Sequence, residues 1–269
     1  MPARPESQPA GAANQATQAE DGGDKNMKQA TRKARPGPRT GGRGRPTRER
    51  ILDVAEQLFA HRGFHGVSVR DITGAAGVDV ALANYYFGSK GGLLEAVFHR
   101  RSELLNAERL HRLEAVLARA PRGRAPALED IIDAFTHPLL DRSERGGPGW
   151  KSFFALVAEV NNSPEWSNVL MTRHFDPLVQ KLIEAIRLAL PGCDDRDLYW
   201  AYHFLSGALT LTFAETGRID RLSGGVCRAS DLDDVHARLV PYCAAGFRAI
   251  CQPGKPRPRV RAARAVRKR

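Results

Sequence analysis

Residues 67–90, VSVRDITGAAGVDVALANYYFGSK, constrain the fold more than any other stretch of this sequence. Ser68 is typical of a helix N-cap, and Asp71 three positions later can return a hydrogen bond to the amide of the cap. Gly77 is expected to end this short helix, and Asp79 to cap a second one. Two short helices joined by a tight glycine turn are typical of a helix-turn-helix, whose second helix enters the major groove of DNA.

A wider pattern surrounds this unit and continues through about 50 residues. Its elements are Ile51 to Phe59, Gly63-Phe64, Asp71-Ile72, Ala76-Gly77-Val78, Tyr85, Phe87, Ser89-Lys90 and Leu93-Leu94. In this register the stretch resembles the DNA-binding domain of the TetR family of bacterial one-component regulators. The chain departs from the family's Leu-Tyr-Tyr-His-Phe run, because Asn84 stands at the first tyrosine and Tyr86 at the histidine. The resemblance implies the fold of the head, whereas the departure concerns the bases that it reads.

The second helix of the unit carries the side chains that are expected to read bases. Asn84 is the one side chain there able to make a bidentate pair with adenine, whereas Val80 and Ala81 could touch thymine methyl groups. Tyr85 and Lys90 match family positions that hold phosphate, and Lys90 is aided by a helix N-terminus.

Further phosphate contacts are expected at the start of the first helix of the unit. Ser68 and Arg70 are the candidates, although Ser68 can instead serve only as a cap. Tyr86 and Phe87 are expected to pack in the core rather than to touch DNA. The complete predicted set of DNA contacts is Arg43, Arg45, Ser68, Arg70, Val80, Ala81, Asn84, Tyr85 and Lys90.

The net charge of +11 lies entirely in the two ends of the chain. Residues 1–50 hold eleven Lys and Arg against five Asp and Glu, residues 253–269 hold eight basic and no acidic residues, and the remainder has a net charge of −3. Residues 1–46 also lack large apolar side chains, so disordered basic tails are predicted at 1–46 and 253–269. Near a DNA-binding unit such tails commonly touch phosphate.

The N-terminal arm ends in Arg43-Gly44-Arg45-Pro46, directly before the first expected helix. This core resembles an AT-hook, whose arginines lie in the narrow minor groove of A·T-rich DNA. A plain basic arm that supplies only phosphate attraction is the alternative, since a match of four residues is weakly specific. Met27 could also be the start of the chain.

Several classes of protein are disfavoured by the composition. No run of eighteen apolar residues exists, and none follows the charges of the N-terminus, so neither a membrane span nor a secretory signal is expected. These features favour a cytoplasmic protein that associates with the bacterial nucleoid. No nucleophile elbow, nucleotide loop or metal-ligand spacing is present, so no enzyme activity, cofactor or metal is expected.

The four cysteines are Cys193, Cys227, Cys243 and Cys251. None forms a CxxC pair, and no histidine stands at zinc spacing from them. Reduced thiols are therefore expected, and a redox or metal sensor is the less favoured alternative.

The sequence predicts an all-α fold with a three-helix helix-turn-helix head at 47–92 and a helical ligand-binding and dimerisation domain at 93–252. Helices are expected at 47–62, 68–77 and 79–88 in the head, then at 89–117, 127–140, 150–161, 164–190 (kinked or broken at Pro177), 194–216 and 232–251, with loops at 142–149 and 217–230. The charged residues of 89–117 are expected to form a solvated face: Arg100, Arg101, Glu103, Glu108 and Arg109.

The resemblance implies a homodimer, because the last two helices of TetR-like regulators form a four-helix bundle with those of a second copy. The helix at 194–216 is apolar nearly all round, which calls for burial on more than one side. The predicted interface residues are Tyr202, Leu205, Leu209, Leu211, Phe213, Leu239 and Phe247. A two-fold dimer would read a palindromic operator.

The resemblance also implies that a small effector binds among the helices of the body. The predicted lining is Phe135, Trp150, Phe153, Phe154, Val157, Glu159, His174, Phe175, His203 and Phe204. For each residue alone, ordinary core packing is the alternative. Its aromatic content favours an apolar or amphipathic molecule, acyl or aromatic. Tyr199-Trp200 through His203-Phe204 and Gly207-Ala208-Leu209 are also similar to fatty-acid-responsive TetR-type repressors.

The leading interpretation is a homodimeric repressor that a ligand releases from its operator by favouring the form that cannot bind DNA. The alternative is a non-specific or architectural DNA-binding protein that uses its basic tails and the arm like an AT-hook. Activation in place of repression stays open, since the sign of regulation depends on the position of the operator.

Overall fold

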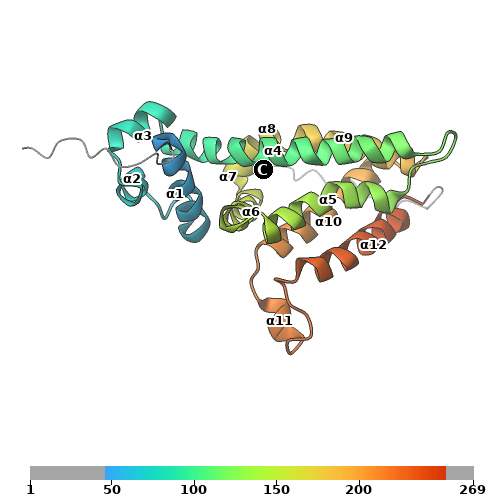
Figure 1. The fold of residues 1–269 in the computed structure, drawn as a ribbon. Helices are drawn as coiled ribbons and strands as arrows, with labels where there is room; N and C mark the ends of the chain where they lie inside the picture. The colour runs from blue at the N-terminus through green and yellow to red at the C-terminus, as the bar shows by residue number, and fades with distance from the viewer. Residues whose placement is uncertain (1–45, 253–269) are drawn as a thin grey trace, which may run out of the picture. The chain divides into compact units, whose positions relative to one another are not determined.

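The computed structural model of the chain describes residues 46–252, and the candidate residues Arg43 and Arg45 fall outside this range, as do the whole tail 253–269 and residues 1–45 of the N-terminal arm. Within it the chain is helical and contains no strand, so the predicted all-α fold is confirmed (Figure 1). The longer helices are α1 (Thr47–Arg62), α2 (Val69–Ala76), α3 (Val80–Phe87), α4 (Lys90–Arg119), α5 (Leu128–Arg145), α6 (Pro148–Asn161), α9 (Asp176–Ala189), α10 (Asp195–Phe213) and α12 (Leu232–Ile250). The short ones are α7 (Pro164–Trp166), the π-helix η1 (Ser167–Met171), α8 (Thr172–His174) and α11 (Arg218–Leu222).

The head has a small apolar core between α1, α2, α3 and the first turns of α4. Ile51 and Phe59 lie on one stripe of α1 and are fully buried, as is Ile72 of α2. The predicted glycine turn is confirmed, because Gly77 has φ 64° and ψ 41° and its N–H donates to the carbonyl of Thr73. Glycine adopts this left-handed conformation without the steric cost that a Cβ brings, so it fixes the angle between α2 and α3.

The body is organised around α5, which packs against both α4 and α12. Its core contains an aromatic cluster from α4, α6 and α10. Phe153 lies 5.6 Å from the ring of Phe98, and Phe154 stacks on Phe213 at 4.6 Å between ring centroids. Since α4 also contributes to the core of the head, it joins the two parts of the described chain.

Three predicted helix boundaries are wrong. α5 continues through Pro138 to Arg145 instead of giving way to a loop at 142–149, and the ion pair of Arg142 with Glu108 at 2.9 Å holds this extension to α4. The predicted helix 164–190 is divided by η1, which was not predicted, and by a break at Phe175, which agrees with the kink or break expected at Pro177. Pro177 lies in the first turn of α9, where its missing N–H costs no hydrogen bond. α11 lies within the predicted loop 217–230.

The prediction of a solvated face on α4 is wrong for three arginines. Arg109 is only 3% exposed, and the side chains of Arg100 and Arg101 are 19% and 20% exposed. Solvent exposure was inferred from the charge of these side chains alone. In the structure, Arg100 and Arg101 face carboxylates of α1, and Arg109 faces the cavity of the body. Glu103, by contrast, is exposed as predicted.

Two of the four cysteines are joined, so the prediction that all are reduced thiols is wrong for them. A disulfide links Cys193, before α10, to Cys251, after α12, while Cys227 and Cys243 are free. The partners are 58 residues apart, and only the packing of α10 on α12 brings them together. Every helix within residues 46–252 is too short or too polar to cross a lipid bilayer.

Candidate functional site

α3 presents the predicted base-reading side chains on its outer face. Asn84 and Ala81 are exposed, Val80 is half-buried, and Tyr85 is 82% exposed. The side-chain amide of Asn84 makes no hydrogen bond to another described residue. Both its donor and its acceptor are therefore available for a base edge.

Tyr86 differs from its prediction, because it is 40% exposed rather than packed in the core. The buried face of α3 follows Ala83 and Phe87, four residues apart, and Tyr86 lies beside that face. Its ring meets Tyr85 edge-on at 5.4 Å. The two tyrosines thus form a paired aromatic surface next to Asn84.

Ser68 forms a complete capping box at the start of α2. Its hydroxyl donates to the Asp71 carboxylate at 2.6 Å and its amide donates to the same oxygen at 2.8 Å, while its oxygen accepts the N–H of Asp71. These bonds from Ser68 lower the pKa of Asp71, so a negative charge lies beside the cap. The structure therefore favours the capping role of Ser68, whereas Arg70 on the same helix is exposed and free of this constraint.

Lys90 stands on an aromatic contact between the head and the body. Its ammonium lies 4.2 Å from the centroid of the Phe64 ring, and Phe64 lies 4.6 Å from Trp166 of α7. Sequence reasoning missed Trp166, and it also missed Arg48 in the first turn of α1, which lies 5.5 Å from the ring of Phe87 on the recognition helix. The position of Arg48, three residues before the apolar stripe of α1, could have indicated its contact with α3. It was not distinguished from the other arginines of the N-terminal arm.

A buried ion-pair network holds α1 of the head to α4. Glu56 is 1% exposed, and both its oxygens accept from Arg101 at 2.9 Å, while Arg100 donates to it at 2.7 Å. Arg100 also donates to Asp53 at 2.8 Å. A Cβ on Gly149, at the start of α6, would lie 2.3 Å from Arg101 Nη2 and 2.8 Å from Glu56 Oε1, so a side chain at this position would displace the ends of this pair.

The cavity of the body lies between α4, α5, α6, η1 and α10 and has a volume of about 60 Å³. Three predicted lining residues are among its walls, namely Phe135, Val157 and Phe175. The remaining walls are Arg109, Leu139, Ala158, Asn161, Met171, Val179, Tyr202, Ser206, Leu209, Thr210 and Phe213. It adjoins an open, more polar depression of about 630 Å³, which shares Asn161, Met171, Tyr202, Ser206 and Thr210 with it.

The other predicted lining residues lie elsewhere. Trp150, Phe153 and Phe154 pack against one another in the core, with ring centroids 5.5 to 5.9 Å apart, because aromatic side chains fill cores as readily as they line pockets. His174 is half-buried beside Phe98 and His99. Glu159 is exposed near Gly63, and His203 and Phe204 are exposed on α10, with His203 reaching only the outer depression.

Arg109 is the feature of the cavity that the sequence concealed. Its Nε donates to the carbonyl of Phe135 at 3.0 Å and its Nη1 to the amide oxygen of Asn106 at 3.3 Å, yet it forms no ion pair within residues 46–252. Burial lowers the pKa of Arg109 to about 9, so the side chain is still a cation at neutral pH. Burial also raises the pKa of Tyr202 opposite it, which keeps that hydroxyl protonated.

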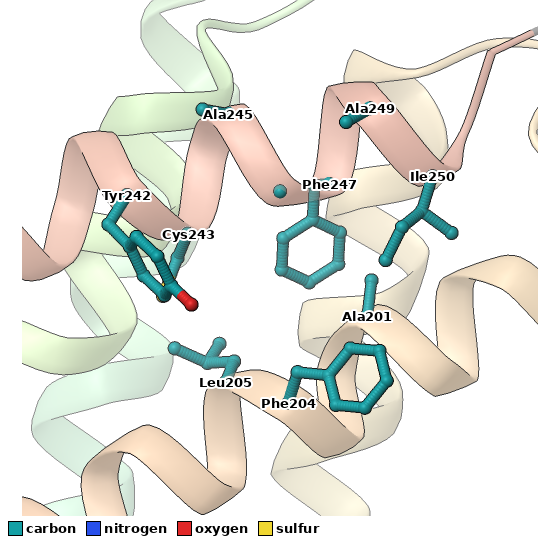
Figure 2. A pocket seen from close by; sticks show the side chains of 10 residues that line it. Ala201, Phe204, Leu205, Tyr242, Cys243, Ala245, Phe247, Ala249 and Ile250 are labelled. Carbon is teal, nitrogen blue, oxygen red and sulfur yellow. The ribbon is translucent and has the colours of Figure 1, made fainter.

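α10 and α12 form an apolar groove of about 450 Å³ on the outside of the body. Figure 2 shows Tyr242 and Phe247 of α12 facing Phe204 and Leu205 of α10 across it. Phe204 is 58% and Tyr242 74% exposed, and Leu211 farther along α10 is 69% exposed. Its α12 side also carries the small residues Ala245, Gly246 and Ala249.

The predicted dimer residues are mostly internal to one protomer. Leu209, Phe213 and Leu239 are buried away from the groove, and Tyr202 turns toward Arg109, whereas Leu205 and Phe247 are largely buried but line the floor of the groove between α10 and α12. Leu211 alone of the set is exposed. Because α10 is apolar nearly all round, its sequence did not reveal which face is covered by the body. The exposed residues Trp200 and Tyr242 were absent from the predicted interface, and Phe204 was assigned to the effector lining.

Asp133 and His137 of α5 meet His236 of α12, although sequence spacing predicted no metal ligands. His236 Nε2 lies 3.0 Å and His137 Nδ1 3.8 Å from Asp133 Oδ1. The ligand-type atoms of the three lie within 4.8 Å of one another. The cluster joins α5 to α12, and its residues are too far apart in sequence to form a recognisable ligand motif.

Two protein-family models match the chain, one in the head and one in the body. The family described as "Bacterial regulatory proteins, tetR family" matches residues 51–97, and "Tetracyclin repressor-like, C-terminal domain" matches residues 133–246. The HTH-type transcriptional regulator BetI of Escherichia coli is 24% identical over 171 residues, which cover 64% of this chain and 84% of that protein. A protein of Bacillus subtilis named "Probable HTH-type transcriptional regulator YttP" is 49% identical over 49 residues, which cover 18% of this chain and 24% of that protein.

Solved structures of regulators share the fold. The fatty acid degradation regulator FadR from Bacillus halodurans has a TM-score of 0.52 at 16% identity, covering 74% of this chain and 96% of that one. The ketosteroid transcriptional regulator KstR2 of Mycobacterium tuberculosis has a TM-score of 0.50 at 16% identity, covering 77% and 98%. The chain belongs to the TetR family of bacterial transcriptional regulators, which act by binding DNA and are not enzymes as a family.

Proposed function

We propose that the chain is a homodimeric repressor that binds a palindromic operator on the bacterial nucleoid through residues 47–92 and is released by a small effector held within residues 93–252. The observation that carries the DNA part is the outer face of α3, where Ala81, Asn84 and Tyr85 are exposed together at the end of a well-capped helix-turn-helix. An exposed amide and an exposed tyrosine on a recognition helix are suited to a base edge and a phosphate.

Base reading and phosphate binding are separable by two substitutions. Asn84→Ala is expected to weaken operator binding by about 1–3 kcal/mol and to leave binding to random DNA unchanged, because a bidentate base contact is lost. Lys90→Ala is expected to weaken binding to operator and random DNA alike, because a phosphate contact is lost. The slope of log affinity against log salt concentration should fall in magnitude by about 1. Fluorescence anisotropy on both DNAs at several salt concentrations measures this. Equal losses on both DNAs for Asn84→Ala would contradict the base-reading role.

The dimer is proposed to form through the groove between α10 and α12. Phe204, Tyr242 and Leu211 leave apolar surface exposed there, and the small side chains of Ala245, Gly246 and Ala249 allow a helix of a second copy to approach closely. A two-fold arrangement would set two α3 helices to read the two halves of an inverted repeat.

The effector is proposed to bind in the cavity beside Arg109 and to act on the head through α4. Asn106 and Arg109 of α4 touch the carbonyls of His174 and Phe135, and the same helix starts at Lys90 and carries Arg100 and Arg101 to α1. A ligand that fits a displaced position of α4 better would favour a head geometry that no longer matches DNA. The apolar walls support an apolar or amphipathic molecule.

A further inference from the structure

We infer that the effector carries an anionic head group, a carboxylate in particular, which binds to Arg109; this rests on the ligand-responsive function proposed above. The cavity contains a cation and no acid, since its lining includes Arg109 but neither Asp nor Glu. Burying a charge without a counter-charge is costly, and proteins normally pair such a group. Arg109 is 3% exposed, its hydrogen-bond acceptors within residues 46–252 are a backbone carbonyl and an amide oxygen, and its guanidinium lies 3.6 Å from the centroid of the Phe135 ring, so no carboxylate of this range neutralises it.

The neutral groups around Arg109 can also serve an anion. Tyr202, Ser206 and Thr210 bring hydroxyl groups to the cavity, and Asn161 donates to the hydroxyl of Thr210 at 2.8 Å. Hydroxyl and amide hydrogens can turn toward a carboxylate oxygen, and a guanidinium can bind two oxygens at once. The lining of the cavity itself holds no acidic acceptor for a cationic ligand, whereas Asp176 lies in the outer depression.

The size and the walls of the cavity determine the rest of the molecule. A volume of about 60 Å³ holds a head group of a few atoms, which is well below the roughly 300 Å³ of a typical ligand pocket. The outer depression shares five lining residues with the cavity, and Phe135, Phe175 and Phe213 provide apolar walls. The remainder of the ligand would lie between α10 and η1, which would have to move apart to admit it. π-Helical turns such as η1 are frequent at functional sites.

The position of Arg109 on α4 gives the anion a direct mechanical role. Arg109 donates a hydrogen bond to the side-chain oxygen of Asn106, one turn earlier on α4. The side-chain nitrogen of Asn106 in turn donates to the carbonyl of His174, beside the break at Phe175. A carboxylate that draws the guanidinium away from Asn106 and the Phe135 carbonyl would therefore loosen the contact of α4 with α5 and α8. Head-group charge would then determine release from the operator as well as affinity.

The test compares octanoate and 3-phenylpropanoate with their primary amides and with octylamine on the full chain. The carboxylates are expected to raise the Tm of the wild-type protein by a few degrees and to bind roughly tenfold more tightly than the amides in calorimetry, because a charge-assisted bond to Arg109 is made only by the acid. Arg109→Met should abolish this preference, and Arg109→Lys should keep part of it. Arg112→Met is the matched control, since Arg112 lies on α4 and pairs with Glu108 outside the cavity.

Arg109→Met is also expected to fold, with a Tm at least equal to that of the wild-type protein, because a buried charge without a counter-charge is removed. Equal binding of amides and acids, preference for octylamine, no response to either carboxylate, or a carboxylate response that survives Arg109→Met would each overturn the inference. Release of operator DNA by the amides would leave the repressor function intact while refuting the anionic head group. Failure of the wild-type protein to prefer any DNA sequence would refute the repressor instead, whatever the carboxylates do.

Discussion

Glu56→Gln is expected to lower the free energy of unfolding by about 3–5 kcal/mol, because it leaves Arg101 without its buried counter-charge and removes one of the carboxylates that pair with Arg100. Glu56 is 1% exposed, and its bidentate bond to Arg101 and its bond to Arg100 tie α1 to α4, together with the bonds of Arg100 to Asp53 and Glu49. The amide of glutamine can replace at most one of these acceptors. Urea denaturation followed by circular dichroism at a fixed protein concentration measures the change.

Glu103→Gln is the matched control for this experiment. Glu103 lies on α4, the helix that carries Arg100 and Arg101, but its side chain is 73% exposed and pairs with the exposed His99 at 3.6 Å. Its substitution is expected to change stability by less than about 0.5 kcal/mol. A loss below about 1 kcal/mol for Glu56→Gln would contradict the view that this network holds the head to α4.

Gly246→Arg is expected to convert the dimer to a monomer and to weaken operator binding by about 10²–10⁴-fold, because the second head is no longer held at the DNA. Gly246 lines the groove between α10 and α12, and nothing lies within 4 Å of a Cβ built on it. The protomer therefore has room for the new side chain, whereas a second copy seated in the groove does not. Light scattering gives the mass, and gel shift at constant salt gives the affinity.

Ala107→Arg adds the same charge to an exposed small residue of α4, away from the groove, and is expected to change neither the mass nor the affinity. If Gly246→Arg stays dimeric with unchanged operator binding, the groove is not the interface. If the variant loses both its dimer and its fold, as judged by circular dichroism, a milder Gly246→Leu substitution tests the same contact.

Much of the head could be predicted from sequence because local signals decide it. Ser68, Gly77 and Asp79 each impose a backbone geometry on their immediate neighbours, and the helix bounds they predict are found. The face of α3 was less predictable, since Tyr86 and Phe87 are both aromatic and only packing against α1 and α4 determines that Phe87 is the inward one.

The body resisted sequence reasoning because its features depend on contacts between distant segments. In the sequence Arg109 is indistinguishable from the exposed charges of the same helix, and only the covering of this side chain by α5 and α10 buries it. The spacing of Trp150, Phe153 and Phe154 is the same whether aromatic residues line a pocket or fill a core. The disulfide between Cys193 and Cys251 and the cluster of Asp133, His137 and His236 likewise join segments whose spacing carries no motif.

Selection of DNA bound by the full chain from a random pool tests the central proposal most directly. A dimer with two α3 helices predicts an enriched inverted repeat whose half-sites are separated by one or more helical turns, bound far more tightly than random DNA at physiological salt. Enrichment of no common sequence, with affinity that only follows salt concentration, would contradict the repressor and support binding through the basic tails alone.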